Sequence, residues 1–365
     1  MARAAVNPPR NPSTRLLHVD ALKALAAQLI VLHHLSAYGP IADAVQSLLP
    51  GLIEVLYRHG RLAVQVFLVV GGFLSARALS RQGQLLEGTP PELLWRRYLR
   101  LVLPFMAAVG LTLACGMLVR PWLPDLVPES VSLPQLLSHA LLLHGVLGMD
   151  ALTAGAWYVA IDFQLFALLL LLLWLARSLK APRGWRVFVG PWLVLGLAAA
   201  SLWLFNCYPE LDDWGLYFFG AYGLGALVHW VMVSRHPRAY FLLVSAIGLA
   251  ALAIEWRERV AVALVTAWLL AALHARHRRG PWRLPRVWGE LGKHSYSLFL
   301  VHYPVCLLVN AVFEQQGFTG AGAGLAMMVL AWGLANLASL PFHRFIEMPS
   351  SRLRLRQIFG TAQRA

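Results

Sequence analysis

Apolar residues occur along this chain in long blocks separated by short polar segments. Ten mostly apolar stretches of 17 to 23 residues are present, and each is about long enough as an α-helix to cross a hydrocarbon layer of ~30 Å. The pattern predicts an all-α, polytopic membrane protein with about ten transmembrane helices. The predicted spans are residues 17–38, 60–79, 98–119, 154–176, 187–206, 214–233, 239–255, 259–275, 294–313 and 322–343.

The distribution of charge over the connecting segments predicts the topology. If the N-terminus is cytoplasmic, 26 of the 31 Lys and Arg fall on the inside, and 11 acidic residues fall outside against 5 inside. Enrichment of Lys and Arg in cytoplasmic loops orients membrane helices, so we expect both termini in the cytoplasm. The five basic residues outside are Arg58, Arg61, Arg120, Arg257 and Arg259.

The composition leaves little room for a soluble domain, since 59% of the residues are hydrophobic and 13% are charged. We expect a disordered cytoplasmic tail at 1–14, one transmembrane domain at 15–349 and a basic cytoplasmic tail at 350–365. The net charge of +14 is explained by orientation in the lipid bilayer and by anionic headgroups, with some charge left for a cytoplasmic anionic ligand. No nucleic-acid partner is expected, and the oligomeric state stays open.

Neither a disulfide framework nor a metal site is expected. The three cysteines are isolated in or beside apolar segments, without a CxxC motif or a paired histidine. The longest outside loop, 120–153, contains an apolar stretch interrupted by Pro134, His139 and His144. It is interpreted as a re-entrant or interfacial helix, because counting it as a span would place the later arginine clusters outside.

The first span carries ionisable groups that need an explanation, because charge within hydrocarbon is costly. Lys23 and His34 are 11 residues apart, almost three helical turns, so they share one face with the imidazole ~16 Å deeper. Asp20 lies near the same stripe and could orient Lys23. The alternative is that Lys23 extends to the interface and His34 bonds a neighbouring helix. His33 points about 100° away and is interpreted as structural.

A second cluster lies at the start of the third span, where Arg97 and Arg100 are one turn apart. Two arginines can hold phosphate groups through paired hydrogen bonds, although such a cluster could serve only to orient the protein. Asp162, His302 and Glu347 are further polar groups in or after spans, and residues of this kind more often bond a neighbouring helix than catalyse a reaction.

Together these residues resemble the acyltransferase 3 family of bacterial integral-membrane acyltransferases, in order and nearly end to end. The matching elements are Asp20, Lys23 and His34, the stretch 60–74, Arg97 with Arg100 and Pro104, WYVAIDFQLF (157–166), LGKHSYSLFLVHYP (291–304) and IEMP (346–349). The chain differs from the family in having Lys23 for an Arg, Asp162 and Phe163 for a pair of Glu, Gln65 for an Asp and Gly71 for a Ser.

The resemblance implies transfer of an acyl group, expected to be acetyl, from cytoplasmic acyl-CoA to a hydroxyl of an envelope glycan or glycan-lipid at the bacterial inner membrane. Arg97, Arg100 and Lys23 are then the expected phosphate ligands. His34 is the expected base or covalent acyl carrier, and Asp162 could hold an imidazole tautomer. Weaker candidates for substrate binding are His302, Trp157, Tyr296, Ser295 and Glu347.

Two other interpretations stay open from the sequence. A transporter or flippase for a glycan-lipid would show the same hydropathy and buried polar groups, although no internal repeat of the kind found in transporters is evident. The same acyl transfer could also act on a small molecule or a lipid. Transport does not need the spacing of Lys23 and His34, and this favours an enzyme.

Overall fold

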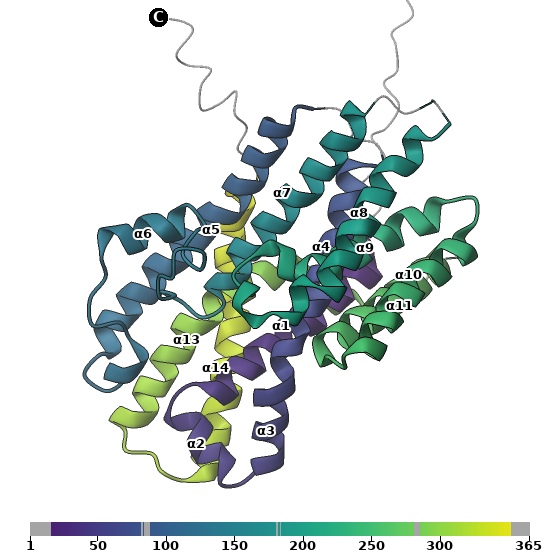
Figure 1. The fold of residues 1–365 in the computed structure, drawn as a ribbon. Helices are drawn as coiled ribbons and strands as arrows, with labels where there is room; N and C mark the ends of the chain where they lie inside the picture. Colours follow the sequence, from purple (N-terminus) through teal and green to yellow (C-terminus); the bar gives the residue numbers. More distant parts are fainter. Residues whose placement is uncertain are drawn as a thin grey trace, which may run out of the picture.

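The computed structural model describes residues 16–81, 83, 88–179, 182, 184–280 and 285–351. The tails predicted at 1–14 and 350–365 therefore lie outside the described residues, except for 350 and 351. All regular elements in the described ranges are helical (Figure 1). The α-helices are α1 Leu17–Ala37, α2 Pro40–Gln46, α3 Pro50–His59, α4 Ala63–Leu79, α5 Pro90–Val119, α6 Leu133–Ala140, α7 Ala156–Ser178, α8 Arg186–Trp203, α9 Gly215–Val233, α10 Pro237–Ile254, α11 Glu258–Arg278, α12 Arg286–Lys293, α13 Ser295–Gln315, α14 Ala321–Phe342 and α15 Met348–Ser350.

The expected all-α polytopic architecture is confirmed. Within the described ranges, nine helical segments are long and apolar enough to cross a membrane, and α1 with α2 forms a tenth candidate that is bent by 89°. The α3 and α4 helices join through a short 3-10 turn into one segment, Pro50–Leu79. This segment begins ten residues before the predicted span 60–79, because Glu54, Arg58 and His59 lower the local hydropathy without ending the helix.

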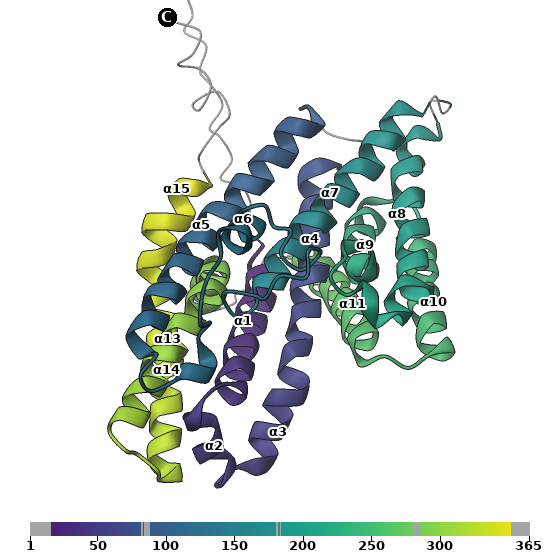
Figure 2. The same cartoon turned by 60° about the vertical axis from the view of Figure 1, so that its left-hand side comes forward.

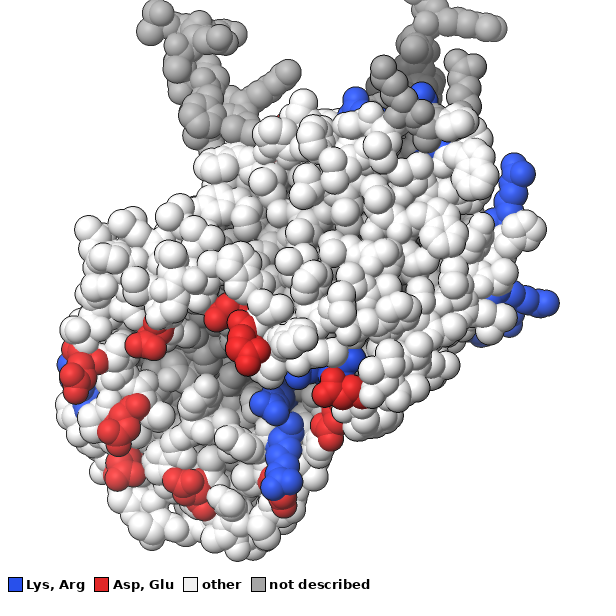
Figure 3. Space-filling view, in the orientation of Figure 1, with Lys and Arg blue, Asp and Glu red and all other residues white. Residues whose placement is uncertain are grey.

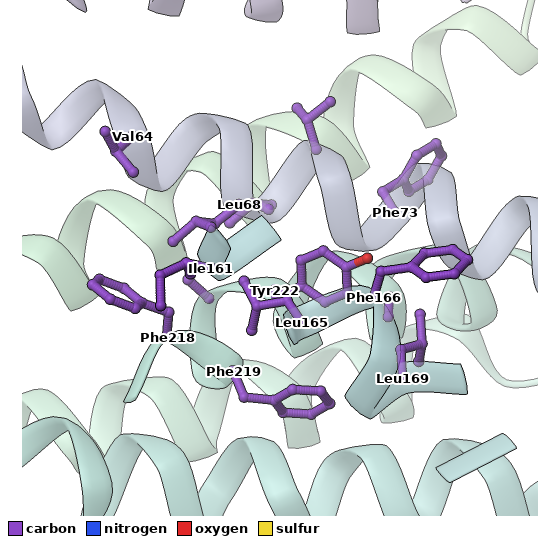
Figure 4. Packing of buried hydrophobic residues seen from close by; sticks show 14 of the residues in the cluster. Val64, Leu68, Phe73, Ile161, Leu165, Phe166, Leu169, Phe218, Phe219 and Tyr222 are labelled. Carbon is purple, nitrogen blue, oxygen red and sulfur yellow. The ribbon is translucent and has the colours of Figure 1, made fainter. Parts of the chain in front are cut away.

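Helix α9 lies at the centre of the fold, with 83% of its most apolar window buried. Its Phe218, Phe219 and Tyr222 pack among side chains of α4 and α7 (Figure 4). A helix that is apolar on all sides is expected to be buried in this way. The position of α9 brings α4 and α7, which carry part of the site described below, into one packed unit.

Two glycines allow the backbones of α4 and α9 to touch. A Cβ added to Gly72 would lie 1.8 Å from the Tyr222 carbonyl oxygen, and one added to Gly225 would lie 1.8 Å from the Val69 carbonyl oxygen. Small residues permit such close crossings between membrane helices. The two contacts are reciprocal, so the crossing is fixed from both helices.

We expect Gly225→Ala to lower the free energy of unfolding by about 1–3 kcal/mol, the usual cost of overpacking. The added methyl group would meet backbone atoms that cannot rotate aside. Thermal unfolding in detergent measures the change, and Gly333→Ala is the matched control because an added Cβ there meets nothing within 4 Å. Equal melting temperatures of the two variants would contradict the assigned crossing.

The remaining helices flank this centre on two sides. Figure 2 shows α13 and α14 on one side and α8, α10 and α11 on the other, with α1 and α4 between them. Only 22% of the α10 window is buried, so this helix is peripheral. The loop 120–153 holds only one short helix, α6, and no span among its residues, in agreement with the expectation of a helix that does not cross.

Charge is unevenly distributed between the two ends of the molecule. The acidic side chains are spread over the lower half of the face seen in Figure 3, with a few basic side chains among them. The cluster of Arg96, Arg97 and Arg100 lies at the start of α5, towards the opposite end (Figure 1). The end that carries the arginine cluster is the one that the loop charges predict to face the cytoplasm.

Candidate functional site

A cavity of about 800 Å³ lies among α1, α4, α5, α7, α12 and α13 and the end of the chain near α15. Its lining is cationic towards the start of α5. Five Lys and Arg side chains line it within the described part of the chain, against two carboxylates, Asp162 and Glu347. The five basic residues are Lys23, Arg96, Arg97, Arg100 and Lys293.

The local sequence of α5 explains how its arginines reach the cavity. The helix begins with Pro90 and Pro91, whose fixed φ and missing N–H suit a first turn. Arg97 and Arg100 then lie three residues apart on one face. Both side chains line the cavity, so the structure brings the predicted arginine pair to one hollow.

The two arginines are not equivalent in their surroundings. Arg97 donates from Nη2 to Oδ2 of Asp162 on α7 at 2.5 Å, and its guanidinium lies 5.2 Å from the Phe166 ring centroid. In this structure the partner of Asp162 is therefore an arginine, whereas the predicted contact of Asp162 with an imidazole stays a prediction. The carboxylate is buried, so it needs a cation close by.

Arg100 is the cavity cation whose charge is available. Among the described residues it has neither an ion-pair nor a hydrogen-bond partner, whereas each of the other four basic lining residues pairs with a carboxylate: Lys23 with Asp20 at 3.1 Å, Arg96 with Glu92, Arg97 with Asp162, and Lys293 with Glu290 at 2.6 Å. Arg100 is also exposed and lines the cavity. An anion in the cavity could therefore accept hydrogen bonds from the planar guanidinium group of Arg100.

Lys23 occupies the position expected for it, at the cavity wall with Asp20 one turn before it. The predicted role of Asp20 in orienting Lys23 agrees with this contact. The Lys23 side chain is 24% exposed, so the pair is reachable from the cavity. The Lys23 ammonium adds positive charge to the cavity that Arg100 also lines, but it is already paired with Asp20.

The other end of the cavity is aromatic. Phe67, Tyr158 and Phe299 line it, with ring centroids 5.9 Å apart for Phe67 and Tyr158 and 5.3 Å apart for Tyr158 and Phe299. The Phe299 ring packs against Gly155, where a Cβ would lie 2.6 Å from the ring. Gly155 has a φ of +77°, a conformation that glycine adopts without strain, and it precedes α7.

His34 lies beyond this aromatic end and is not among the lining residues. Its ring centroid is 4.8 Å from that of His302, which in turn lies 6.0 Å from the Phe299 ring. Tyr38 stacks on the other side of His34 at 5.5 Å. The sequence of rings from the cavity is thus Phe299, His302 and His34, and His34 itself is half-buried.

The neighbouring His33 is used differently. Its Nδ1 lies 3.1 Å from the Leu56 carbonyl oxygen, and its Cβ would be 2.8 Å from a Cβ on Gly60. These contacts join α1 to the segment that leads into α4. The geometry agrees with the structural role expected for His33.

The weaker candidates divide between the cavity and the rest of the molecule. Ser295, Tyr296 and Glu347 line the cavity, and Tyr296 donates from its hydroxyl to the Leu101 carbonyl oxygen at 2.9 Å. Glu347 accepts from the Ser297 hydroxyl at 2.6 Å, which ties the end of α14 to α13. Trp157 packs on Phe218 at the start of α7 and does not line the cavity.

Sequence reasoning missed several residues of this site. Lys293 and Tyr158 are adjacent to candidates inside the matched strings, so their neighbours pointed to them. Phe67 and Phe299 also lie inside the matched strings 60–74 and 291–304, but an aromatic residue in an apolar span is more often packing than site. Only the three-dimensional arrangement places these two rings between the cationic cavity and the histidines.

A comparison with protein families gives the family of the chain. The family model described as acyltransferase domain, acyltransferase 3, matches residues 16–341. The chain belongs to this acyltransferase family. The matched range includes every site residue named above except Glu347.

One curated relative of this acyltransferase is the Regulator of hypoxia-inducible factor 1 of Caenorhabditis elegans. It is 23% identical over 414 residues, which cover 93% of this chain and 80% of that protein. The name of the relative describes regulation and does not identify a reaction. No solved structure matches the chain.

Proposed function

We propose that the protein transfers an acetyl group from acetyl-CoA to a hydroxyl of a cell-envelope glycan. The observation that carries the proposal is a cavity of about 800 Å³ whose Arg100 has no ion-pair partner among the described residues, with a histidine pair just beyond its aromatic end. This layout suits a long donor with an anionic end and a reactive end. The nucleotide phosphates would bind at Arg100, with Lys23 and Arg97 adding positive potential.

The pantetheine arm would run along the cavity towards Phe299 and bring the thioester to His34. A neutral imidazole can accept a hydroxyl proton at physiological pH. Holding the donor at both ends also lowers the entropic cost of bringing thioester and hydroxyl together. The glycan would approach from the side of Tyr38, at the end of α1 remote from Arg100.

Membrane vesicles from an expressing bacterial host test the reaction. Acetyl-CoA labelled in its acetyl group is added, and label in the extracted glycan fraction is measured together with released thiol. We expect both signals to depend on the protein. Movement of glycan across the membrane without incorporation of label would instead indicate a transporter and would refute the proposal.

Arg100→Ala is expected to weaken acetyl-CoA binding by roughly ten- to one-hundred-fold, since a hydrogen bond to a charged group is worth about 1.5–3 kcal/mol. Turnover at saturating donor should change little, because Arg100 lines the cavity and the histidine pair does not. Donor titration of initial rates separates the two effects. The matched control is Arg279→Ala, an exposed arginine outside the cavity lining, and equal donor KM values for the two variants would remove Arg100 from the phosphate site.

A further inference from the structure

His34 and His302 form a close pair that joins α1 to α13, although 268 positions separate them in sequence. Their ring centroids lie 4.8 Å apart, with the planes inclined by 34°. Two imidazoles joined by an N–H···N hydrogen bond have centroids about 5 Å apart. The spacing therefore leaves no room for a third group between the rings and suits a direct bond between them.

The tautomer of neutral His302 follows from its surroundings. Its Nδ1 lies 2.7 Å from the Phe299 carbonyl oxygen, and a carbonyl oxygen can only accept. Nδ1 must therefore carry the hydrogen, and Nε2 keeps a lone pair. His302 is only 2% exposed, and its Nε2 has no hydrogen-bond partner among the described residues.

His34 offers the complementary atom. Its Nδ1 is buried and has no hydrogen-bond partner in the described part of the chain. Tyr38 contributes a stacked ring face to His34. The His33 ring centroid also lies 5.0 Å from that of His34, but the Nδ1 of His33 is directed to the Leu56 carbonyl oxygen. No carboxylate forms an ion pair with His34 or His302 within the described ranges, and Asp162 is taken by Arg97.

We propose that His302 is a positioning residue for His34. Its Nε2 accepts a hydrogen bond from the Nδ1–H of His34, which a small rotation of either ring would close. This bond selects the tautomer of His34 whose Nε2 is free to take the hydroxyl proton, and it stabilises the imidazolium that follows. The inference rests on the proposed function, and it assigns to a histidine the orienting role that a carboxylate has in many hydrolases.

The chemistry balances without a further reactant. The hydroxyl proton moves to Nε2 of His34 while the hydroxyl oxygen forms a bond to the thioester carbon. Collapse of the tetrahedral intermediate breaks the C–S bond, and its electron pair leaves on sulfur. The proton on Nε2 then passes to the thiolate, so His34 and His302 return to their starting forms.

The test compares His302→Leu with His302→Gln in the vesicle assay with labelled acetyl-CoA. Leu removes the acceptor, and kcat is expected to fall roughly ten- to one-hundred-fold, the range found when the orienting partner of a functional imidazole is lost. Gln offers an amide oxygen of similar reach and should recover most of that loss. The KM for acetyl-CoA should stay within about twofold in both variants, since the phosphates bind elsewhere.

His229→Gln is the matched control, because His229 is also a buried imidazole with an unpartnered Nε2 but lies on α9 away from the pair. Its kcat should equal that of the wild type. Wild-type kcat in His302→Leu, or equal losses in the Gln and Leu variants, would overturn the inference. If Leu fails to fold by thermal unfolding, His302→Asn replaces it, since this shorter amide should not reach His34. A wild-type protein without transfer would instead refute the proposed function.

Discussion

Replacing His34 with alanine is expected to lower the rate of acyl transfer by ~10²–10⁴-fold, the usual contribution of a general base. The donor site should remain intact, because His34 does not line the cavity that contains Arg100. Acetyl-CoA affinity, measured by equilibrium binding to the purified protein, should therefore stay near the wild-type value. The loss should appear in turnover of the labelled donor at saturation.

The adjacent histidine provides the control for this experiment. His33→Gln removes an imidazole one residue away, whose Nδ1 contacts a backbone carbonyl oxygen and not His302. We expect this variant to melt at a lower temperature but to keep its turnover per folded molecule. Equal loss of turnover in the two variants would mean that the local structure of α1 is required and that His34 has no specific role in catalysis.

Arg97→Leu is expected to lower the free energy of unfolding by about 3–5 kcal/mol, the cost of removing one partner of a buried ion pair. The Asp162 side chain is 7% exposed, so a mostly buried carboxylate would lose the cation that pairs with it. Reversible unfolding in mixed detergent micelles measures the change. A decrease below about 1 kcal/mol would show that the carboxylate is not buried as described.

A second variant isolates the pair itself. Arg97→Leu combined with Asp162→Leu removes both charges, and we expect it to be more stable than Arg97→Leu alone, since a buried pair can often be replaced by apolar residues at little cost. The neighbouring Arg96→Leu serves as the control because its ion pair with Glu92 is exposed. Its effect should stay within about 0.5 kcal/mol.

Much of the fold could be predicted from the sequence because the bilayer imposes a length on each span. The predicted span 187–206 differs from the helical segment Arg186–Cys207 by one residue at each end. The charged helix α3 was missed, since hydropathy finds the limits of the apolar layer and does not find the ends of helices. The bend between α1 and α2 was also missed, because the predicted span 17–38 contains no sign of it.

The site was only partly predictable, and distance along the chain explains the difference. Lys23 and Asp20 are neighbours on one helix, so helical periodicity placed them together. The pairing of Arg97 with Asp162 joins residues 65 positions apart, and no local pattern encodes which arginine a buried carboxylate will take. The contact between His34 and His302 spans still more of the chain, and it depends on how α13 packs against α1.

Helix α1 is continuous, and it carries both Lys23 at the cavity wall and His34 beside His302. Each residue of an α-helix adds 1.5 Å of rise and 100° of rotation. A substitution between Lys23 and His34 leaves both side chains on the same face of α1. An insertion or deletion of one residue would rotate His34 by about 100° and turn it away from His302. The spacing of Lys23 and His34 therefore depends on the length of the helix between them more than on its side chains.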